Sequence, residues 1–298
     1  MSDDSNQARI DKHQVRSSFG LAAADYDRVA VLQREVGTRL LERLELIKAA
    51  PRDVLDLGSG TGYIARALTA RYRRARVVAV DIAAPMLTEA RRRSGWWRRR
   101  PQLVCGDMEC LPFADGSVDM ILSNLALQWC NDLDATFAGF RRILRPGGVL
   151  LFTSFGPDTL LELRASWAAV DRFSHVNRFL DMHDVGDALV RTGLAEPVLD
   201  VERSTLTYPD VDGLVRDLKT LGAHNVTAGR PRGLTGPGRW QRMRERYEAF
   251  RTEGLLPATY EVVYGHAWVG APPVPAVTGD PGTVTVPLSK LSGRSSKR

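Results

Sequence analysis

The stretch Val54-Leu55-Asp56-Leu57-Gly58-Ser59-Gly60-Thr61-Gly62 decides the fold of this protein. Its first four residues form a short apolar run typical of a buried strand, and the helical pattern of Ile64 to Tyr72 follows directly. Three glycines at alternate positions let the backbone turn sharply and approach a ligand closely, because they carry no Cβ atom. The helix that follows adds unpaired N–H groups and the positive end of its dipole. The sequence therefore predicts a strand–loop–helix unit that binds a cofactor.

Short apolar runs continue to alternate with helical patterns beyond this unit. They predict further strands at 77–80, 103–105, 120–122, 149–152 and 259–268. Apolar spacings of three and four predict helices at 85–93 and 133–144, and the second of these ends at Pro146-Gly147-Gly148. Because strands that alternate with helices imply right-handed crossovers, we expect a parallel sheet with helices on its faces.

The pattern divides the chain into four parts. Residues 1–48, with a helix expected at 27–48, are predicted to form an N-terminal helical lid, and residues 49–156 a cofactor-binding core. The part at 157–270 is expected to supply closing strands and the substrate-side helices at 158–170, 183–192, 211–221 and 237–251. The tail at 271–298 is rich in Pro, Gly and Ser, lacks aromatic residues, and is predicted to be disordered and basic.

The charge and composition of the chain indicate an enzyme-sized body with a modest basic excess. The 298 residues carry a net charge of +6, and half of that excess lies in the tail. The remaining charge is too small for a protein that coats nucleic acid, although it would favour an acidic partner. With 44% hydrophobic and 26% charged residues, the composition is that of an ordinary globular protein.

Hydropathy and cysteine content indicate the cellular compartment in which the protein is expected. No uninterrupted apolar run reaches the roughly 18 residues of a spanning helix, and the acidic, polar start at 1–7 differs from a secretory signal. The three cysteines lack Cys-x-x-Cys spacing, which argues against a disulfide framework and a zinc knuckle. We therefore expect a cytoplasmic protein that does not bind membranes, with its cysteines buried as small apolar side chains.

Two cofactors suit the glycine loop. A dinucleotide is one, because Gly60-x-Gly62-x-x-Ala65 satisfies the loose pyrophosphate fingerprint. The other is S-adenosylmethionine, whose aminoacyl portion would lie along the loop. Asp81, which ends the second strand, suits both, since a carboxylate can accept hydrogen bonds from two ribose hydroxyls. Asp107 ends the third strand, where it can accept from the adenine amino group while Met108 packs on the ring, and this third anchor favours S-adenosylmethionine.

Other chemical motifs are weak. The five histidines show no His-x-x-x-His or Glu-x-x-His spacing, so we expect no metal site, and no Gly-x-Ser-x-Gly elbow occurs. The stretch from Arg91 to Arg100 holds six arginines in ten positions. We interpret it as a solvated loop, with docking of an acidic partner as the alternative.

The glycine loop, Asp81 and Asp107, together with Ser123 to Ala126 at the end of the fourth strand, resemble the cofactor site of class I methyltransferases. Over about residues 10–268 the chain resembles one family in particular, the malonyl-acyl-carrier-protein O-methyltransferases of biotin synthesis. The most specific segments are Gln128-Trp129-Cys130 and His175 to Phe179. The others are Phe19-x-x-x-Ala23-x-x-Tyr26 with Gln33, Leu218 to Ala223, Arg230 with Leu234-Thr235, and Leu256 to Val262. Ser59 stands where many members have cysteine, and the arginine-rich stretch and the tail are not part of the family pattern.

The resemblance implies a fold and a reaction. The fold is α/β, a Rossmann-like, doubly wound and mostly parallel seven-stranded sheet with an antiparallel last strand and helical lid elements. The reaction is S-adenosylmethionine-dependent methylation of the free carboxylate of the malonyl thioester on an acyl carrier protein, which primes pimeloyl synthesis. A carboxyl group with a pKa of about 4 is ionised at neutral pH, so no general base is expected. The partner is expected to be the acidic carrier protein.

The resemblance also implies the site residues. Tyr26 is expected to fold over the methionine end of the cofactor, and Trp129 to supply an apolar wall beside the donor group of Gln128. The predicted cofactor-binding residues are Tyr26, Gln33, Asp56, Gly58, Ser59, Gly60, Gly62, Asp81, Ile82, Asp107, Met108 and Asn124. The residues expected to position the acceptor are Tyr26, Gln128, Trp129, His175, Arg178, Lys219 and Arg230, with Arg178 and Arg230 as leading candidates for holding the malonyl carboxylate.

Two other functions stay open at the level of sequence. One is methyl transfer to a different small acceptor, such as a quinone ring or a free carboxylic acid. The other is a cofactor-binding protein of the same fold that assembles or modifies a respiratory complex.

Overall fold

A computed structural model describes residues 9–95, 99–223, 225–227, 233 and 235–270. The predicted disordered tail, Arg230, and residues 96–98 of the arginine-rich stretch lie outside these described residues. The sheet consists of β1 (Asp53–Leu57), β2 (Arg76–Asp81), β3 (Gln102–Cys105), β4 (Val118–Ser123), β5 (Leu144–Phe155), β6 (Ala195–Tyr208) and β7 (Leu256–Trp268).

The seven strands lie in the order β3-β2-β1-β4-β5-β7-β6. Strands β1 to β5 pair in parallel, and β7 runs antiparallel to both of its neighbours, β5 and β6. This arrangement confirms the expected Rossmann-like, mostly parallel sheet with an antiparallel last strand. Because the first five strands point the same way, their carboxyl ends meet at one edge, where ligands bind in open α/β sheets.

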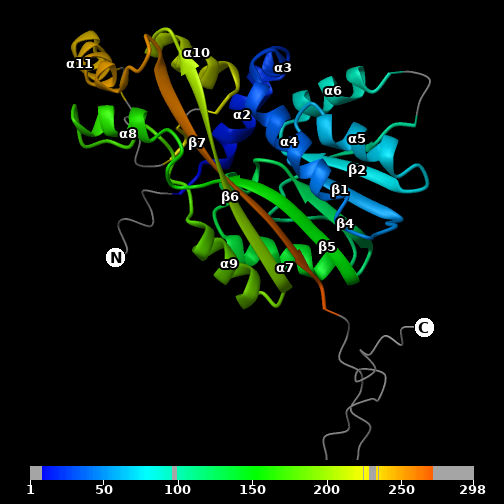
Figure 1. The fold of residues 1–298 in the computed structure, drawn as a ribbon. Helices are drawn as coiled ribbons and strands as arrows, with labels where there is room; N and C mark the ends of the chain where they lie inside the picture. The colour runs from blue at the N-terminus through cyan, green and yellow to red at the C-terminus, as the bar shows by residue number, and fades with distance from the viewer. Residues whose placement is uncertain (1–8, 96–98, 224, 228–232, 234, 271–298) are drawn as a thin grey trace, which may run out of the picture.

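Helices cover both faces of the sheet (Figure 1). They are α2 (Lys12–Ala22), α3 (Tyr26–Val29), α4 (Val31–Arg43), α5 (Tyr63–Arg71), α6 (Ala84–Arg93), α7 (Leu133–Ile143), α8 (Leu161–Ala168), α9 (Met182–Arg191), α10 (Val211–Thr220) and α11 (Pro237–Tyr247), with short 3₁₀ turns η1 (Leu127–Trp129) and η2 (Glu248–Phe250). Alternate strand residues separate two cores, since neighbours in a strand point to opposite faces. Met120 packs with α4 and α5, whereas Ile121 packs with α7 and α9.

A third core lies at the end of the β6–β7 pair, where α8, α10 and α11 gather (Figure 1). It joins Trp167 of α8, Leu214 of α10 and Tyr247 of α11 to Tyr260 of β7. This core fixes the helical part of the chain beside the carboxyl edge of the sheet.

Several expectations from the sequence need correction. The single helix predicted at 27–48 is two helices, because Ala30 adopts φ −78° and ψ +45° between α3 and α4, and the second helix ends at Arg43. The sequence predicted a helical N-terminal part and seven strands, but it gave no residue range for helix α2 or strand β6. Cys105 and Cys110 are exposed rather than buried, and Cys130 is half-buried.

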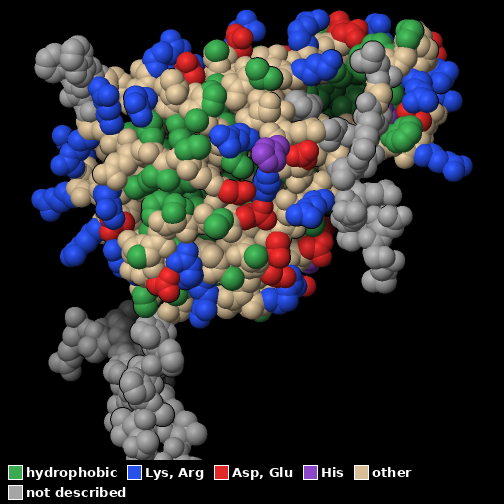
Figure 2. Space-filling view, turned by 180° about the vertical axis from the view of Figure 1, so that it is seen from behind, with side chains coloured by type: hydrophobic (Ala, Val, Ile, Leu, Met, Phe, Trp, Pro, Cys, Tyr) green, Lys and Arg blue, Asp and Glu red, His purple; other side chains and the backbone are tan. Residues whose placement is uncertain are grey.

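The charged side chains are dispersed on the face turned away from the viewer in Figure 1. Basic side chains lie around the outline of the molecule, with acidic side chains among them (Figure 2). Of the arginine-rich stretch, the first three residues form the last turn of α6, where Arg93 pairs with Asp27 at 3.0 Å and Arg92 with Glu89 at 2.7 Å. Among the described helices, none is both long and apolar enough to span a membrane.

Candidate active site

The glycine loop between β1 and α5 lies at the carboxyl edge of the sheet. Gly58, Gly60 and Gly62 all adopt positive φ angles, of +69°, +52° and +77°. The backbone N–H groups of Gly58 and Ser59 donate to the carbonyl oxygen of Val80 at 2.9 and 3.0 Å, which ties the loop to β2. The sharp turn that the sequence predicts is therefore present.

Asp81 ends β2 and holds the loop from the other side. Its Oδ2 accepts from the Gly60 N–H at 2.8 Å, and its Oδ1 accepts from the Ala83 N–H at 2.8 Å. Burial raises the pKa of Asp81 to about 6, although both hydrogen bonds lower it. Because each carboxylate oxygen has a further lone pair, Asp81 can still accept hydrogen bonds from a ligand.

Asp56 lies buried at the end of β1, next to the same loop. Burial raises the pKa of its carboxyl group to about 7; an N–H donated by Ala65 opposes this shift, and the charge of Asp81 adds to it. Its Oδ2 has no hydrogen-bond partner among the described residues. Asp56 lines a recess of about 430 Å³ beside the loop, together with Ser59, Thr61 and Gln33.

The loop opens into a cleft of about 860 Å³, here called the central cleft. Its walls are largely apolar with a few polar side chains, which is typical of small-molecule and cofactor sites. The predicted site residues that line it are Tyr26, Gln33, Gly58, Gly60, Asp81, Ile82, Asp107, Met108, Asn124, Gln128 and Trp129. Sequence reasoning thus identified side chains from the ends of several strands that the fold brings to one cavity.

Unpartnered acceptor atoms in these cavities fit S-adenosylmethionine. Among the described side chains, the buried Oε1 atoms of Gln33 and Gln128, the Oδ2 of Asp56 and the Oγ of Ser59 have no hydrogen-bond partner. Buried polar groups are normally paired, so these atoms point to a bound ligand with N–H or O–H donors. The ammonium and ribose hydroxyls of S-adenosylmethionine are such donors, and a Cβ at Gly60 would meet no atom within 4 Å.

Aromatic side chains form one wall of the central cleft. Phe19 of α2 packs edge-on against Trp129 of η1, with ring centroids 5.3 Å apart, and lies 6.5 Å from the ring of Tyr26. Burial and the charge of Asp81 raise the pKa of Tyr26 above its usual value, so its hydroxyl stays a donor. The wall combines apolar surface with one fixed hydrogen-bond donor.

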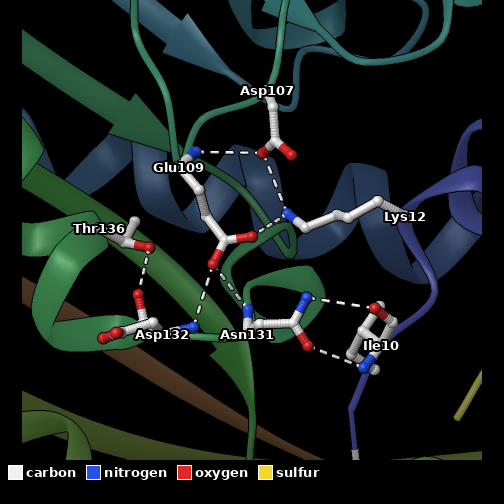
Figure 3. A network of polar contacts seen from close by, with 7 residues as sticks. All are labelled: Ile10, Lys12, Asp107, Glu109, Asn131, Asp132 and Thr136. Carbon is white, nitrogen blue, oxygen red and sulfur yellow. Dashed lines mark hydrogen bonds and ion pairs between the residues drawn. The ribbon is translucent and has the colours of Figure 1, made fainter. Parts of the chain in front are cut away.

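The N-terminal segment is fastened across this edge by a polar network (Figure 3). Lys12 contacts Asp107 at 3.0 Å and also Glu109. Partial burial opposes the charge of Lys12, but these two carboxylates raise its pKa overall. Asn131 exchanges two hydrogen bonds with the Ile10 backbone, at 2.8 and 3.1 Å, and its own N–H donates to Glu109. The segment is thereby held against the ends of β3 and η1.

A second cavity of about 1290 Å³, here called the side groove, adjoins the central cleft. Gln128 and Cys130 line both cavities. The side groove is further lined by Arg9, Ile10, Leu127, Asn131, Leu133, Ser154, Arg178, Phe179, Leu180 and Val185. The N-terminal segment contributes to the walls of both spaces, since Arg9 and Ile10 line the side groove and Lys12 and Val15 line the central cleft.

Two predicted acceptor residues lie outside both linings. The ring of His175 stacks on Trp167 with centroids 3.7 Å apart, and its Nε2 is 2.9 Å from Asp171 Oδ1. Lys219 is exposed on the last turn of α10. In the cofactor set, Gly62 caps α5, and a Cβ there would meet the Cβ of Ala90 at 3.0 Å, so its position allows close helix packing.

Sequence reasoning missed several lining residues. Lys12 and Val15 belong to α2, and Leu221 and Ala223 follow α10. The one available signal for α2 was Asp11, whose side chain accepts from the N–H groups of residues 13 and 14 as a helix N-cap. Among the described residues, no three His, Cys, Asp or Glu side chains are grouped so as to hold a metal ion.

Fold and central cleft together define an S-adenosylmethionine-dependent methyltransferase of the Rossmann-like class. A family profile described as a methyltransferase domain matches residues 55–152. The malonyl-[acyl-carrier protein] O-methyltransferase of Gallionella capsiferriformans is 55% identical over 274 residues, which cover 90% of this chain and 94% of that protein. The protein of the same name from Laribacter hongkongensis is 57% identical, over 87% of this chain and 89% of its own length. The chain belongs to the malonyl-[acyl-carrier protein] O-methyltransferase family.

Solved structures support the fold alone. A methyltransferase structure from Bacillus halodurans matches with a TM-score of 0.58 at 18% identity, covering 78% of this chain and all of that one. A [4+2]-cyclase matches with a TM-score of 0.51 at 19% identity, covering 80% and 82%. Since a cyclase has the same fold, the activity has to be argued from the site and the close relatives.

Proposed function

We propose that this protein transfers a methyl group from S-adenosylmethionine to the free carboxylate of a malonyl thioester carried by an acyl carrier protein, in biotin synthesis. The observation that carries the proposal is the junction of two cavities at Gln128 and Cys130. One cavity has the acceptor atoms of a cofactor site, and the other offers a separate approach for the methyl acceptor. The full-length similarity to proteins of this name supports the same conclusion.

The cofactor side of the proposal assigns a task to each anchor. Asp81 accepts from the ribose hydroxyls, Asp107 from the adenine amino group, and Asp56 with Gln33 from the ammonium group. When bound, S-adenosylmethionine supplies an electrophilic methyl group on a sulfonium. The Tyr26 ring covers the methionine end, and α2 and α3 form a lid that excludes water from this space.

The acceptor side requires positioning rather than proton transfer. A malonyl carboxylate is already ionised at neutral pH, so the protein needs to desolvate and align it, which can supply on the order of 7–11 kcal/mol. Gln128 lines both cavities and Trp129 lines the central cleft beside it, and these two are the residues proposed to contact the reacting group. His175 lies outside both linings, so its proposed role is to position other residues through its contacts with Trp167 and Asp171.

The proposal extends to partner and compartment. The mildly basic chain fits an acidic carrier protein, and the lack of Cys-x-x-Cys spacing fits a reducing cytoplasm. Both belong to the same proposal, since fatty-acid carriers and their enzymes share that compartment.

Methyl transfer to malonyl acyl carrier protein tests the function directly. Transfer of labelled methyl should exceed that to a quinone or a free carboxylic acid, and the gene should restore biotin-independent growth to a cell that lacks this methyltransferase. Growth without biotin and transfer to the malonyl carrier are the supporting outcomes. Failure of both, with cofactor binding intact, would favour an assembly factor of the same fold.

Two variants separate the cofactor and acceptor sides. Asp81→Ala should abolish binding of S-adenosylhomocysteine, because the N–H groups of Gly60 and Ala83 and the ribose lose their acceptor. Arg178→Ala should retain that binding and weaken use of the malonyl acceptor. Calorimetry checks both, and equal loss of cofactor affinity in the two variants would contradict the division.

A further inference from the structure

The side groove has a buried end and an exposed end. Leu127 and Ser154 are buried at 3% and 7% exposure, whereas Arg9 and Arg178 are exposed. Gln128, which also lines the central cleft, follows Leu127 directly. The buried end therefore meets the central cleft, and the two arginines lie at the exposed end, facing solvent.

The charged side chains that line the side groove are all positive. Within the described part of the chain, neither Arg9 nor Arg178 forms an ion pair, and no carboxylate lines the groove. The walls also include the apolar side chains Leu133, Phe179 and Val185 and the polar side chains Asn131 and Ser154. An elongated ligand that is anionic at its outer end and largely uncharged along its length would match this arrangement.

We propose that the side groove binds the phosphopantetheine arm of the acyl carrier, with Arg9 and Arg178 contacting its phosphate at the exposed end. This inference rests on the proposed function and specifies how the acceptor enters. Pantetheine is uncharged and carries two amide groups, so it can lie along walls that combine apolar side chains with Asn131 and Ser154, and the thioester end then reaches Gln128. Arg178 therefore contacts the phosphate rather than the malonyl carboxylate, and the carboxylate reacts at the buried junction.

Two acceptors that differ only in the phosphate test the assignment. Turnover is measured with malonyl-4′-phosphopantetheine and with malonyl-pantetheine, using wild type, Arg9→Gln and Arg178→Gln. The ratio of kcat/KM for the two acceptors should fall about tenfold in each variant, as expected for one charge-assisted hydrogen bond. Arg74→Gln is the matched control, because Arg74 is exposed in the turn before β2, at the opposite edge of the sheet.

Binding without turnover separates this inference from the proposed function. With the central cleft saturated by S-adenosylhomocysteine, 4′-phosphopantetheine should bind wild type more tightly than pantetheine does, and the two variants should abolish that difference. If kcat/KM in the variants falls by the same factor for both malonyl acceptors, the arginines contact the carboxylate and the inference is wrong. The inference is also wrong if the variants keep both the wild-type ratio of kcat/KM for the two acceptors and the wild-type preference for 4′-phosphopantetheine over pantetheine. If wild type methylates neither acceptor but still prefers the phosphorylated arm, the proposed reaction fails while the groove assignment stands.

Discussion

At the scale of single residues, each of the three loop glycines is required for a different structural reason. A Cβ at Gly58 would lie 2.3 Å from the Cβ of Ala126, which no backbone could accommodate without moving. At Gly62 the nearest contact would be 3.0 Å, to Ala90 of α6. At Gly60 the same atom would enter open space in the central cleft. Only Gly60 is therefore needed mainly for the ligand.

Alanine substitutions should distinguish an effect on stability from an effect on cofactor affinity. Gly58→Ala adds left-handed strain to a collision and should lower the free energy of unfolding by at least about 2 kcal/mol. Gly60→Ala adds strain alone, about 1 kcal/mol, but should weaken binding of S-adenosylhomocysteine about tenfold or more. Urea unfolding and calorimetry measure the two effects. Gly116→Ala, at φ +55° with open space around it, is the control that should retain cofactor affinity.

The proposed role of the buried carboxyl groups Asp81 and Asp56 predicts that cofactor affinity depends on pH. Folding raises the pKa of Asp81 to about 6 and of Asp56 to about 7. The free protein therefore loses stability as pH rises from about 4 to 7, because the folded state holds these protons more tightly than the unfolded state. Ligand donors prefer the ionised carboxylates, so affinity for S-adenosylhomocysteine should rise over pH 6 to 7 and level off above about 8.

Calorimetry at several pH values checks this expectation. Asp56→Asn should remove the part of the rise near pH 7 and keep the part near pH 6. An affinity that is constant between about pH 5.5 and 8.5 would contradict the assignment of both carboxylates to the cofactor.

At the scale of elements, Lys12 makes ion pairs that join α2 to the rest of the molecule. Lys12 joins the start of α2 to the carboxylates that follow β3, and all three side chains are less than one-third exposed. Lys12→Gln removes the cation between two neighbouring carboxylates, so amides of α2 should exchange with deuterium about tenfold faster. Global stability should fall by only about 1 kcal/mol, as expected for partly exposed ion pairs.

Arg28→Gln is the control for this exchange experiment. Arg28 of α3 pairs with Asp25 at 3.6 Å, and both side chains are mostly exposed. Its removal should leave exchange in α2 unchanged. Equal protection of α2 in wild type and Lys12→Gln would show that apolar contacts, rather than this network, hold the helix.

Element prediction failed where tertiary contacts replace local signals. Strand β6 has exposed positions such as Val198 alternating with half-buried ones, and it carries charged residues that suit a sheet edge. Ion pairs with α4 explain the acidic residues of β6. Arg43 of α4 pairs with Asp200 at 2.7 Å and with Glu202 at 2.9 Å. These pairings join residues far apart in sequence, so no local pattern could indicate them.

At the scale of the whole molecule, the sheet depends on a close contact between β5 and β7. Gly265 pairs with Phe152, and a Cβ there would lie 2.3 Å from the buried Phe152 ring. Gly265→Ala should lower the free energy of unfolding by about 1–3 kcal/mol through overpacking, measured in urea. Gly139→Ala, in helix α7 with open space, should be neutral or stabilising by up to about 1 kcal/mol. Equal effects of the two substitutions would contradict this account.

The sequence by itself determined the parallel sheet, the glycine loop and the carboxylates at the strand ends, because strand periodicity and parallel direction place those positions at one edge. It also carried the family resemblance at Gln128 and Trp129. Only the tertiary structure decided that Lys12 closes that edge, that Arg178 lines a second cavity, and that His175 lies against Trp167 outside both linings. These facts depend on packing between distant segments, whose contacts are set by the shapes of buried surfaces and not by any local spacing.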